Sequence, residues 1–476
     1  MRKIAEYIAK AYNLEMNGDY CTEWVSPLEL LTENRFDIIA KYIYIENKMS
    51  DCKHGKKLYL DHIRAMTKNS FIEAGNVRKN SAEAFCNAFD ELILDIGTHG
   101  YREEYIPIPV DENMNILDGS HRTATCLYYN CPIKIVKLPV KLSTGYDYKY
   151  FRKNGLNEKY LDEMILRYIE LSKDIYIANI WPVAEEGYKK VEKLIKKTGN
   201  IFYDKEVKLE MRGAVNYIRQ VYQNDSWIGD VNNQFEGCYR KAVACFEDRN
   251  VIKIYVFKTS GKNVLPLKEA VRNLFDKGKN SIHINDTKEE AVTMARLLLN
   301  QNSIDFLNRG DVCKYPKSYK RFCAFSGEKK DGAVTGSMVM ALYGIREAND
   351  LDFIDKQGTE GAHNYLERYY PDKVQELLSN PEYYFFSDNL KILTINCVRQ
   401  FKKARNEKKD REDVELINAY LEGRKENKVA EWKREYILKK RLLMAKIQGS
   451  LLIIAHRTNT YDVLKKLYHF IRRKNR

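Results

Sequence analysis

Two aspartates stand two residues apart in an apolar stretch that predicts a short strand at 351–354. Because alternate residues of a strand point to the same face, we expect the carboxylates of Asp350 and Asp352 to lie side by side. Two such carboxylates repel one another unless a cation lies between them, and Mg²⁺ commonly takes one or two carboxylates together with substrate phosphates. The spacing therefore predicts a Mg²⁺ site at Asp350 and Asp352.

A Gly-Ser pair precedes the aspartates by about a dozen residues. Gly336 and Ser337 open a predicted helix through Tyr343, where backbone N–H groups and the Ser337 hydroxyl can bind terminal phosphates. Arg346 follows this helix and can offset charge that develops on the phosphates. With a divalent cation, these are the parts of a nucleotidyl-transfer site, in which metals bridge the phosphates and stabilise an in-line displacement. The alternative is a capped helix beside an exposed strand, because Asp-x-Asp alone is common.

The combined stretch from Thr335 to Ile354 resembles the nucleotidyltransferase superfamily typified by DNA polymerase β, whose pattern is Gly-Ser, a helix, and Asp-x-Asp on a strand. The resemblance implies that Asp350 and Asp352 are catalytic metal ligands and that Gly336 and Ser337 bind the phosphates. It also implies a third carboxylate on a later strand. Asp388 is the nearest residue that could fill this role, although it stands in a predicted turn. The donor would be a nucleoside triphosphate of unidentified base.

A charged segment further along the chain resembles the helix of small nucleotidyltransferases in which a lysine reaches the triphosphate. It runs from Lys402 to Asp410, with Asp413 following. The resemblance implies that Lys402, Arg405 or Lys409 binds phosphate. The alternative is a charged helix that simply faces solvent.

A second motif, from Asp118 to Arg122, lies between a short predicted strand and a predicted helix at 123–129. Backbone N–H groups of Ser120, His121 and Arg122 can point at a phosphate there, and the helix dipole favours an anion. Gly119 lets the backbone approach closely, and Arg122 offers a planar pair of donors. The alternative is an ordinary turn in which Asp118 is the cap and His121 and Arg122 face solvent.

This motif and its flanks, 106–110 and 132–136, resemble the ParB/sulfiredoxin-like superfamily over about residues 55–140. Members include CTP-binding partition proteins, ATP-using sulfiredoxins and free-serine kinases. The resemblance implies that Gly119, Ser120, His121 and Arg122 face nucleotide phosphates. Sulfiredoxins have a catalytic cysteine where Ser120 stands, which argues against sulfinic acid repair. A kinase would need a carboxylate base, and the sequence leaves four open: Glu73, Asp95, Glu103 and Glu104.

The elements that must position these motifs predict an α/β (α+β) protein. We expect a ParB/sulfiredoxin-like nucleotide-binding domain at 1–145, a connector at 146–172, a middle α/β region at 173–312, a nucleotidyltransferase-like domain at 313–420, and a basic helical tail at 421–476. Strands are expected at 105–110, from Ile116, and at 321–325. A hairpin is expected from 383–386 with 390–398, followed by helix from Arg399.

Composition excludes several classes of protein. The 476 residues are 44% hydrophobic and 31% charged, which suits several packed cores. No run of about 18 apolar residues predicts a membrane span, and the start lacks the apolar core of a signal peptide, so we expect a cytoplasmic protein. Ten scattered cysteines predict free thiols. Residues 421–476 hold 16 Lys and Arg against 5 Asp and Glu, and therefore +11 of the net +14. Such a tail can contact an anionic membrane surface peripherally or face solvent.

These observations predict Mg²⁺-dependent transfer of a nucleotidyl or substituted-phosphoryl group from a nucleoside triphosphate to a small-molecule or sugar acceptor. Nucleic acid is not expected as a partner, because the body lacks a basic stripe with interleaved aromatics. By analogy with superfamily members such as phosphocholine transferases, the process would be bacterial surface-polysaccharide metabolism. Three alternatives stay open: an ATP- or ADP-dependent small-molecule kinase that uses Gly119–Arg122, a non-catalytic nucleotide sensor, and nucleic-acid binding through the tail.

Overall fold

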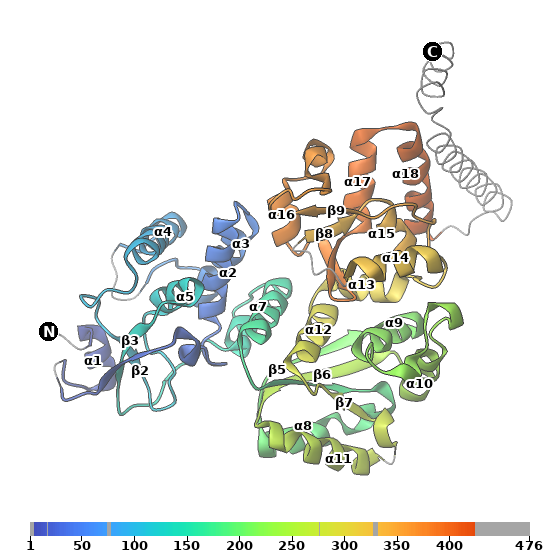
Figure 1. Cartoon of the computed structure of the whole chain (residues 1–476). Coiled ribbons are helices and arrows are strands. Elements are labelled where there is room, and N and C mark those ends of the chain that lie inside the picture. The colour runs from blue at the N-terminus through green and yellow to red at the C-terminus, as the bar shows by residue number, and fades with distance from the viewer. Residues whose placement is uncertain (1–3, 17, 74–77, 276, 327–331, 424–476) are drawn as a thin grey trace, which may run out of the picture. The chain divides into compact units, whose positions relative to one another are not determined.

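The computed structural model describes residues 4–16, 18–73, 78–275, 277–326 and 332–423 (Figure 1). By its internal contacts the chain divides into two compact units, residues 1–410 and 411–476. The described residues form three separate sheets with helices packed on them, which confirms the predicted mixed α/β class. The predicted basic tail from residue 424 onward lies outside the described residues.

The first sheet is built from β1 (Thr22–Val25), β2 (Ile108–Val110) and β3 (Ile133–Lys137), in the order β1-β3-β2. β2 and β3 run parallel, and α5 (Ser120–Tyr129) provides the crossover that a parallel pair requires. Helices in the same part of the chain are α1 (Glu6–Tyr12), α2 (Asp37–Met49), α3 (His54–Met66) and α4 (Ala82–His99). The predicted strand at Ile116 is only an isolated bridge to Val110, because the Asp111 carboxylate holds a tight turn between them.

The middle sheet contains β4 (Ile175–Ile180), β5 (Asn200–Lys208), β6 (Val251–Lys258) and β7 (Ile282–Ile284), in the antiparallel order β5-β6-β4-β7. α8 (Tyr188–Thr198) follows β4 and α11 (Val264–Phe275) follows β6, so the element order is the split βαβ arrangement, β-α-β-β-α-β. α9 (Met211–Val221) and α10 (Glu236–Phe246) are inserted between β5 and β6, and α12 (Lys288–Leu298) follows β7.

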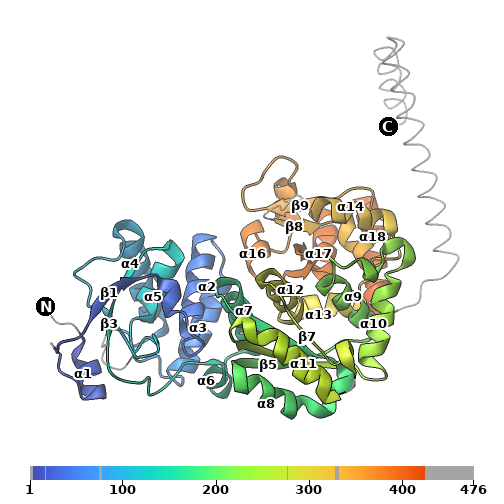
Figure 2. The same ribbon diagram turned by 60° about the horizontal axis from the view of Figure 1, so that its bottom comes forward.

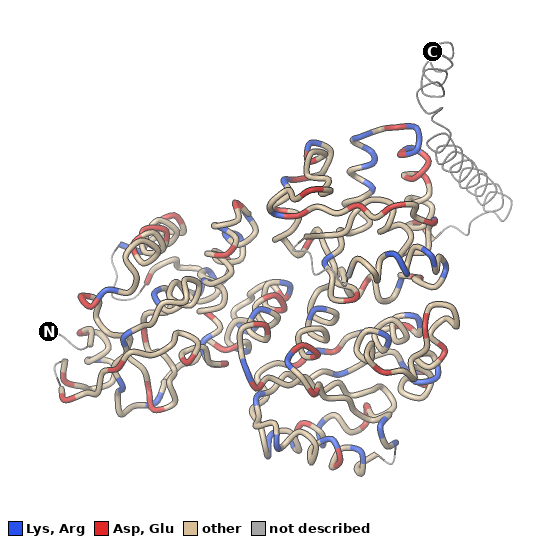
Figure 3. Tube along the Cα trace, viewed as in Figure 1, with Lys and Arg blue, Asp and Glu red and all other residues tan. Residues whose placement is uncertain are grey.

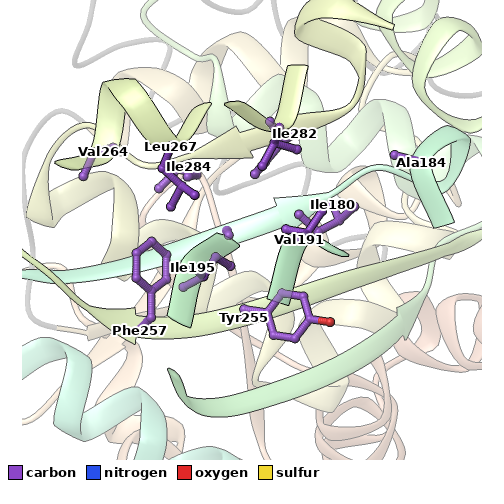
Figure 4. Packing of buried hydrophobic residues seen from close by; sticks show 12 residues of the cluster. Ile180, Ala184, Val191, Ile195, Tyr255, Phe257, Val264, Leu267, Ile282 and Ile284 are labelled. Atoms are coloured by element: carbon purple, nitrogen blue, oxygen red, sulfur yellow. The ribbon is translucent and has the colours of Figure 1, made fainter. Parts of the chain in front are cut away.

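One face of the middle sheet carries an apolar core (Figure 4). Alternate residues of β4 and β7 point to this face and pack on α8 and α11, which lie side by side in Figures 1 and 2. The main buried members are Ala178, Ile180, Val191, Ile195, Phe257, Leu267, Ile282 and Ile284. Asn179 and His283 are register partners that lie between these positions, and so they point to the opposite face of the sheet.

The third sheet has the order β10-β11-β8-β9, formed by β8 (Gly332–Thr335), β9 (Asp352–Asp355), β10 (Tyr384–Ser387) and β11 (Leu390–Leu393). β8 runs antiparallel to β9 and parallel to β11. α15 (Ser337–Leu342) connects β8 toward β9, and α16 (Val374–Ser379) and α17 (Ile395–Arg405) cover the sheet through Leu377, Cys397 and Phe401.

Two predicted strands in this region are wrong. Residues 321–325 belong to α14 (Pro316–Ser326), where Tyr319 and Phe322 are buried at the three-residue spacing of a helix face. The predicted strand 390–398 stops at Leu393, because the Thr394 side chain accepts a hydrogen bond from the backbone N–H of Cys397 and caps α17. At both places the run of apolar residues is too short for its periodicity to distinguish a strand from a helix.

The remaining α-helices are α6 (Tyr148–Lys153), α7 (Glu158–Leu171), α13 (Gln301–Arg309) and α18 (Lys408–Leu421), and a 3-10 helix, η7 (His363–Tyr369), follows β9. Thr287 caps α12, since its side chain accepts a hydrogen bond from the Glu290 backbone N–H. Among the described helices, none is both long and apolar enough to cross a bilayer. Acidic and basic residues are interspersed along the described trace (Figure 3).

Candidate functional site

The Gly-Ser turn and the aspartate pair meet at one end of the β8–β9 pair, two strands that lie side by side in Figure 1. β8 ends at Thr335, whose register partner on β9 is Asp352. Gly336 follows with φ of 69°, and α15 begins at Ser337. The Ser337 Oγ donates a hydrogen bond to Asp350 Oδ1 at 3.0 Å. The structure therefore brings Gly336, Ser337, Asp350 and Asp352 together from two segments that are about a dozen residues apart.

Gly336 allows the backbone to come closer to the Asp352 carboxylate than any residue with a side chain would permit. Its φ lies in the left-handed region that favours glycine, and a Cβ added there would collide with Asp352 Oδ2. The backbone turn and the Asp352 carboxylate are thus in direct contact. Only a residue without a side chain can leave this carboxylate where it is.

The Asp350 and Asp352 carboxylates lie close enough to repel each other. Burial, and then the neighbouring Asp350 carboxylate, raise the pKa of Asp352 above its ordinary value. His363, Lys402 and Arg405 oppose this shift but do not cancel it. The Asp352 side chain remains 23% exposed, so solvent and ligands can reach it. A divalent cation would relieve the remaining repulsion, because it favours the ionised form of both carboxylates.

His363 is a member of the site that the sequence did not indicate. Its Nδ1 lies 3.5 Å from Asp352 Oδ1, and it belongs to η7, which follows β9. Its ring also contacts Tyr365, whose side chain is 73% exposed. No motif or spacing marks His363, because its place depends on how the loop after β9 folds back to the start of that strand.

Two of the three predicted phosphate-binding basic residues lie close enough to Asp352 to lower its pKa. Lys402 is buried and its Nζ is 3.3 Å from Asp410 Oδ1, while Arg405 makes a two-point ion pair with the same carboxylate at 2.7 Å. Lys409 is different: its side chain is 62% exposed and pairs with Glu407. Lys402 and Arg405 therefore form a fixed positive group beside the site, and Lys409 is not part of it.

Asp388 is not brought to the aspartate pair. It is buried in the turn between β10 and β11, where its carboxylate accepts hydrogen bonds from Arg219, Tyr319 and Ser387. Burial raises the pKa of Asp388, but the Arg219 guanidinium outweighs burial and holds that pKa below its ordinary value. Its oxygens are therefore occupied by an ion pair. In the part of the chain that the structure describes, no group of three His, Cys, Asp or Glu residues could hold a metal ion.

Arg346 lies just past the end of α15, where its Nη1 donates to the main-chain oxygen of Glu347 at 2.9 Å. This hydrogen bond holds the guanidinium against the backbone of the next residue.

We expect Gly336→Ala to weaken divalent-cation binding and the predicted transfer by at least about tenfold, because the new Cβ must displace the Asp352 carboxylate and the left-handed φ costs a further ~1 kcal/mol. Calorimetric titration with Mn²⁺ measures the first effect. Gly358→Ala is the matched control, since Gly358 has φ of 64° but its Cβ would meet nothing nearer than 3.6 Å. Equal losses in both variants would show that the collision with Asp352 is unimportant.

The second motif is folded more tightly than the sequence suggests. Gly119 has φ of 89° at the start of α5, and its backbone packs against the Ile108 side chain. His121 is buried, its Nε2 is hydrogen-bonded to the Tyr59 hydroxyl at 2.9 Å, and its ring lies against Phe89. Burial, helped by nearby lysines, holds the pKa of His121 well below its ordinary value. The alternative in which the His121 side chain faces solvent is therefore wrong, whereas contact of the His121 backbone N–H with phosphate stays a prediction.

Arg122 and Asp118 close this loop on itself. Arg122 Nη1 donates to the main-chain oxygen of Ile106 at 2.5 Å, and Nη2 lies 3.6 Å from Asp118 Oδ2. Ser120 is buried at the first position of α5. Gly119, Ser120 and Arg122, which were predicted to bind phosphate, lie at the start of α5. Two nitrogens of the Arg122 guanidinium already contact the Ile106 carbonyl and the Asp118 carboxylate.

A buried ion cluster behind this loop was not predicted. Asp37 accepts from Arg35 at 2.8 and 2.9 Å and from Lys41 Nζ at 3.0 Å, and all three side chains are almost fully buried. A third nitrogen of Arg35 donates to the main-chain oxygen of Ile116, two residues before Asp118. The cluster therefore braces the strand end that leads into the motif.

Among the four predicted kinase bases, only Glu73 is tied to this region. Its Oε2 pairs with Lys79 Nζ at 3.0 Å, and its charge contributes to the raised pKa of Tyr7 together with Asp118. Asp95 instead pairs with His99 and Arg102 and accepts a hydrogen bond from the Tyr105 hydroxyl. Glu103 and Glu104 are exposed in the loop after α4.

A cavity of about 900 Å³ lies at neither motif. It reaches Gly332 and Lys356, at the ends of β8 and β9 opposite to Gly336 and Asp352. Charged residues of its lining pair with one another, for example Arg296 with Glu170 at 2.8 Å and Lys205 with Asp162 at 2.6 Å. The cavity therefore does not contribute to the aspartate site.

The chain matches no model of a protein family, and no curated protein and no solved structure matches it.

Proposed function

We propose that the part of the chain around β8 and β9 catalyses Mg²⁺-dependent transfer of a nucleotidyl or substituted-phosphoryl group from a nucleoside triphosphate to a small-molecule or sugar acceptor. One observation carries the proposal: the Gly336 turn and the Ser337 hydroxyl contact the Asp350 and Asp352 carboxylates directly, and the pKa of Asp352 is raised by its burial and by its neighbour. A pair of strained, partly exposed carboxylates next to a glycine turn is a common basis for binding a cation with phosphates.

The residues present fit a magnesium ion. Asp350 and Asp352 supply oxygen ligands and a local excess of negative charge, and Mg²⁺ needs only one or two carboxylates when phosphates and water complete its shell. These two residues would hold the ion. When bound, Mg²⁺ would neutralise charge on the triphosphate and so favour in-line displacement at phosphorus.

The chain's own groups would bind and orient the donor. The Gly336 backbone and the Ser337 hydroxyl would bind triphosphate oxygens next to the aspartates, since both already lie against them. Lys402 and Arg405 would add positive charge, and because Asp410 fixes both side chains, this charge needs no reorganisation when the donor binds. The exposed ring of Tyr365 would offer a face for stacking a planar group.

His363 would take the proton from the acceptor hydroxyl. Asp388 is occupied by Arg219, whereas the His363 imidazole is in reach of Asp352 and partly exposed. A positioned histidine contributes about 10²–10⁴-fold to proton transfer. A histidine in this role would replace the third carboxylate that the described residues do not bring to the pair.

We expect His363→Gln to lower kcat by about 10²-fold while leaving the affinity for Mn²⁺ within a factor of about three, because the imidazole would move a proton and not hold the metal. Steady-state kinetics and a Mn²⁺ titration measure the two effects. His99→Gln removes an exposed histidine that also pairs with an aspartate, and it serves as the control. Unchanged kcat in His363→Gln would remove His363 from the mechanism.

Incubation with labelled ATP, CTP, GTP and UTP, Mg²⁺ and a metabolite extract tests the proposed reaction. Released pyrophosphate and a labelled product indicate nucleotidyl transfer, and both should disappear in Asp352→Asn but persist in Arg122→Ala. Released ADP that disappears in Arg122→Ala would indicate a small-molecule kinase at the second motif. No turnover across a broad pool of acceptors would favour a nucleotide sensor.

The second motif is the weaker basis for a catalytic site. Its histidine is buried against Tyr59 and Phe89, and its arginine is engaged by the Ile106 carbonyl and Asp118. The fixed ion pairs of Arg35, Asp37 and Lys41 behind it resemble structural support more than a reaction site. Nucleotide binding without chemistry suits this arrangement better than phosphoryl transfer.

A further inference from the structure

Two cysteines lie at the carboxyl end of α5, in a turn that brings their side chains together. α5 ends at Tyr129, and Asn130 follows with φ of 49°, in the left-handed region. The backbone N–H groups of Asn130 and Cys131 both donate to the main-chain oxygen of Cys126, the second of them at 3.0 Å. This second bond spans six residues, as in the Schellman motif, where the first and last side chains are frequently in contact. Those two residues are Cys126 and Cys131.

The two thiols also influence each other directly. The Cys126 thiol donates a hydrogen bond to the Cys131 sulfur, and this bond is the largest influence on the pKa of both groups. Together with the backbone N–H groups of Tyr101 and Cys131, it lowers the pKa of Cys131 to about 7, although burial opposes this shift. The same bond, helped by burial, raises the pKa of Cys126. At neutral pH a thiolate therefore lies beside a protonated thiol.

Only one member of the pair is accessible. Cys131 is partly exposed and its chain neighbour on each side is exposed, so a small reagent can reach its sulfur, whereas Cys126 is 0% exposed. Elsewhere in the chain, burial raises the pKa of Cys245 and Cys397, which keeps these thiols protonated. Cysteines that react with oxidants have a low pKa, are accessible, and often lie next to a second thiol. Cys131 meets these three conditions.

We propose that Cys131 is a peroxide-reactive modification site and that Cys126 converts its oxidised form to an intramolecular disulfide. The Cys131 thiolate attacks hydrogen peroxide: an S–O bond forms, the O–O bond breaks and hydroxide leaves. The sulfur is thereby oxidised by two electrons to a sulfenic acid, and the peroxide is reduced. The Cys126 sulfur then attacks the sulfenic sulfur, so that the S–S bond forms, the S–O bond breaks, and hydroxide leaves with the thiol proton as water. This chemistry does not depend on the proposed transferase.

Mass spectrometry of the full chain after peroxide treatment tests the proposal. The reduced protein is exposed to increasing concentrations of hydrogen peroxide, its remaining thiols are alkylated, and it is digested with trypsin without reduction. Cleavage after Arg122 and Lys134 gives one peptide, 123–134, which contains Cys126, Cys131 and no other cysteine. We expect this peptide to lose two hydrogens and to escape alkylation at a peroxide concentration at least about tenfold below the one that oxidises Cys21, an exposed cysteine elsewhere in the chain.

Three serine variants assign the roles. In Cys126→Ser, oxidation of Cys131 should yield a sulfenic acid that dimedone traps, and the loss of two hydrogens should disappear. In Cys131→Ser, Cys126 should stay reduced at the same peroxide concentration, because it is buried and its pKa is raised. Cys245→Ser removes a buried thiol from another part of the chain and should leave the disulfide unchanged.

Two results for the wild type would overturn the proposal, and neither requires a variant to fold. In the first, Cys126 and Cys131 are both still alkylated at peroxide concentrations that oxidise Cys21. In the second, Cys131 forms disulfides between two chains instead of one within peptide 123–134, as a gel without reductant would show.

Discussion

Replacing Asp352 with asparagine should abolish transfer and, at the same time, make the protein more stable. Loss of a metal-binding carboxylate should lower kcat/KM by about 10³-fold, which corresponds to ~4 kcal/mol of transition-state stabilisation. Stability should rise because the repulsion between Asp350 and Asp352 disappears. Enzyme kinetics and urea unfolding at pH 7 measure the two effects on the same preparation.

The raised pKa of Asp352 also determines in which direction the stability changes with pH. Since the pKa of Asp352 is raised in the folded protein, the folded state binds more protons than the unfolded state above the ordinary pKa of 3.8. The wild type should therefore lose stability as the pH rises through the raised pKa, and Asp352→Asn should not. The stability difference between them should be smallest at low pH and largest near neutrality. A constant difference across that range would contradict the electrostatic strain described above.

Asp355 provides a matched control on the same strand. It lies at the other end of β9, where its carboxylate accepts from the backbone N–H groups of Gly358 and Thr359. Those bonds lower its pKa although burial opposes them, so its charge stabilises the fold. Asp355→Asn should therefore lose stability and keep activity, which is the reverse of the result expected for Asp352→Asn.

Asp388→Asn should lower the free energy of unfolding by about 3–5 kcal/mol without lowering turnover per folded molecule. The substitution leaves the buried Arg219 guanidinium without a counter-charge in a place that solvent does not reach. Denaturant unfolding gives the loss of stability, and kcat corrected for the folded fraction gives the effect on catalysis. Unchanged stability with a collapse of kcat would instead identify Asp388 as the third catalytic carboxylate.

The exposed ion pair of Asp51 and Lys373 provides the control for Asp388→Asn. Asp51 pairs with Lys373 at 2.9 Å, and both side chains are largely exposed. Water and salt screen such a pair, so Asp51→Asn should change stability very little. A large loss in both variants would indicate that charge removal itself, rather than burial of an unpaired guanidinium, destabilises the chain.

Residue types and their spacing over a short stretch of sequence were enough to predict that the Gly-Ser turn and the aspartate pair come together. Gly336 and Ser337 follow β8 directly, and Asp352 begins β9 while Asp350 lies just before that strand, so the turns at the two strand ends and the pairing of β8 with β9 determine their relation. The mixed α/β class follows from the same short-range signals. These features depend on residues fewer than about 20 positions apart.

Long-range packing explains what the sequence did not predict. The partner of Asp388 is Arg219 on α9, 169 positions away, and nothing near either residue reveals the pairing. His363 reaches Asp352 only because η7 folds back after β9. In the case of His121 a signal was present, because it shares a buried helix face with Ala124 and Thr125, and that spacing indicates a core position.

Binding of Mn²⁺, followed by electron paramagnetic resonance, tests most directly whether Asp350 and Asp352 hold one divalent ion. In the presence of a non-hydrolysable nucleoside triphosphate, the wild type should bind Mn²⁺ at a site that weakens by at least about a hundredfold in Asp350→Asn and in Asp352→Asn, and that Asp355→Asn retains. Equal Mn²⁺ binding in the wild type and in both variants would contradict the assignment of the aspartate pair and, with it, the proposed transferase.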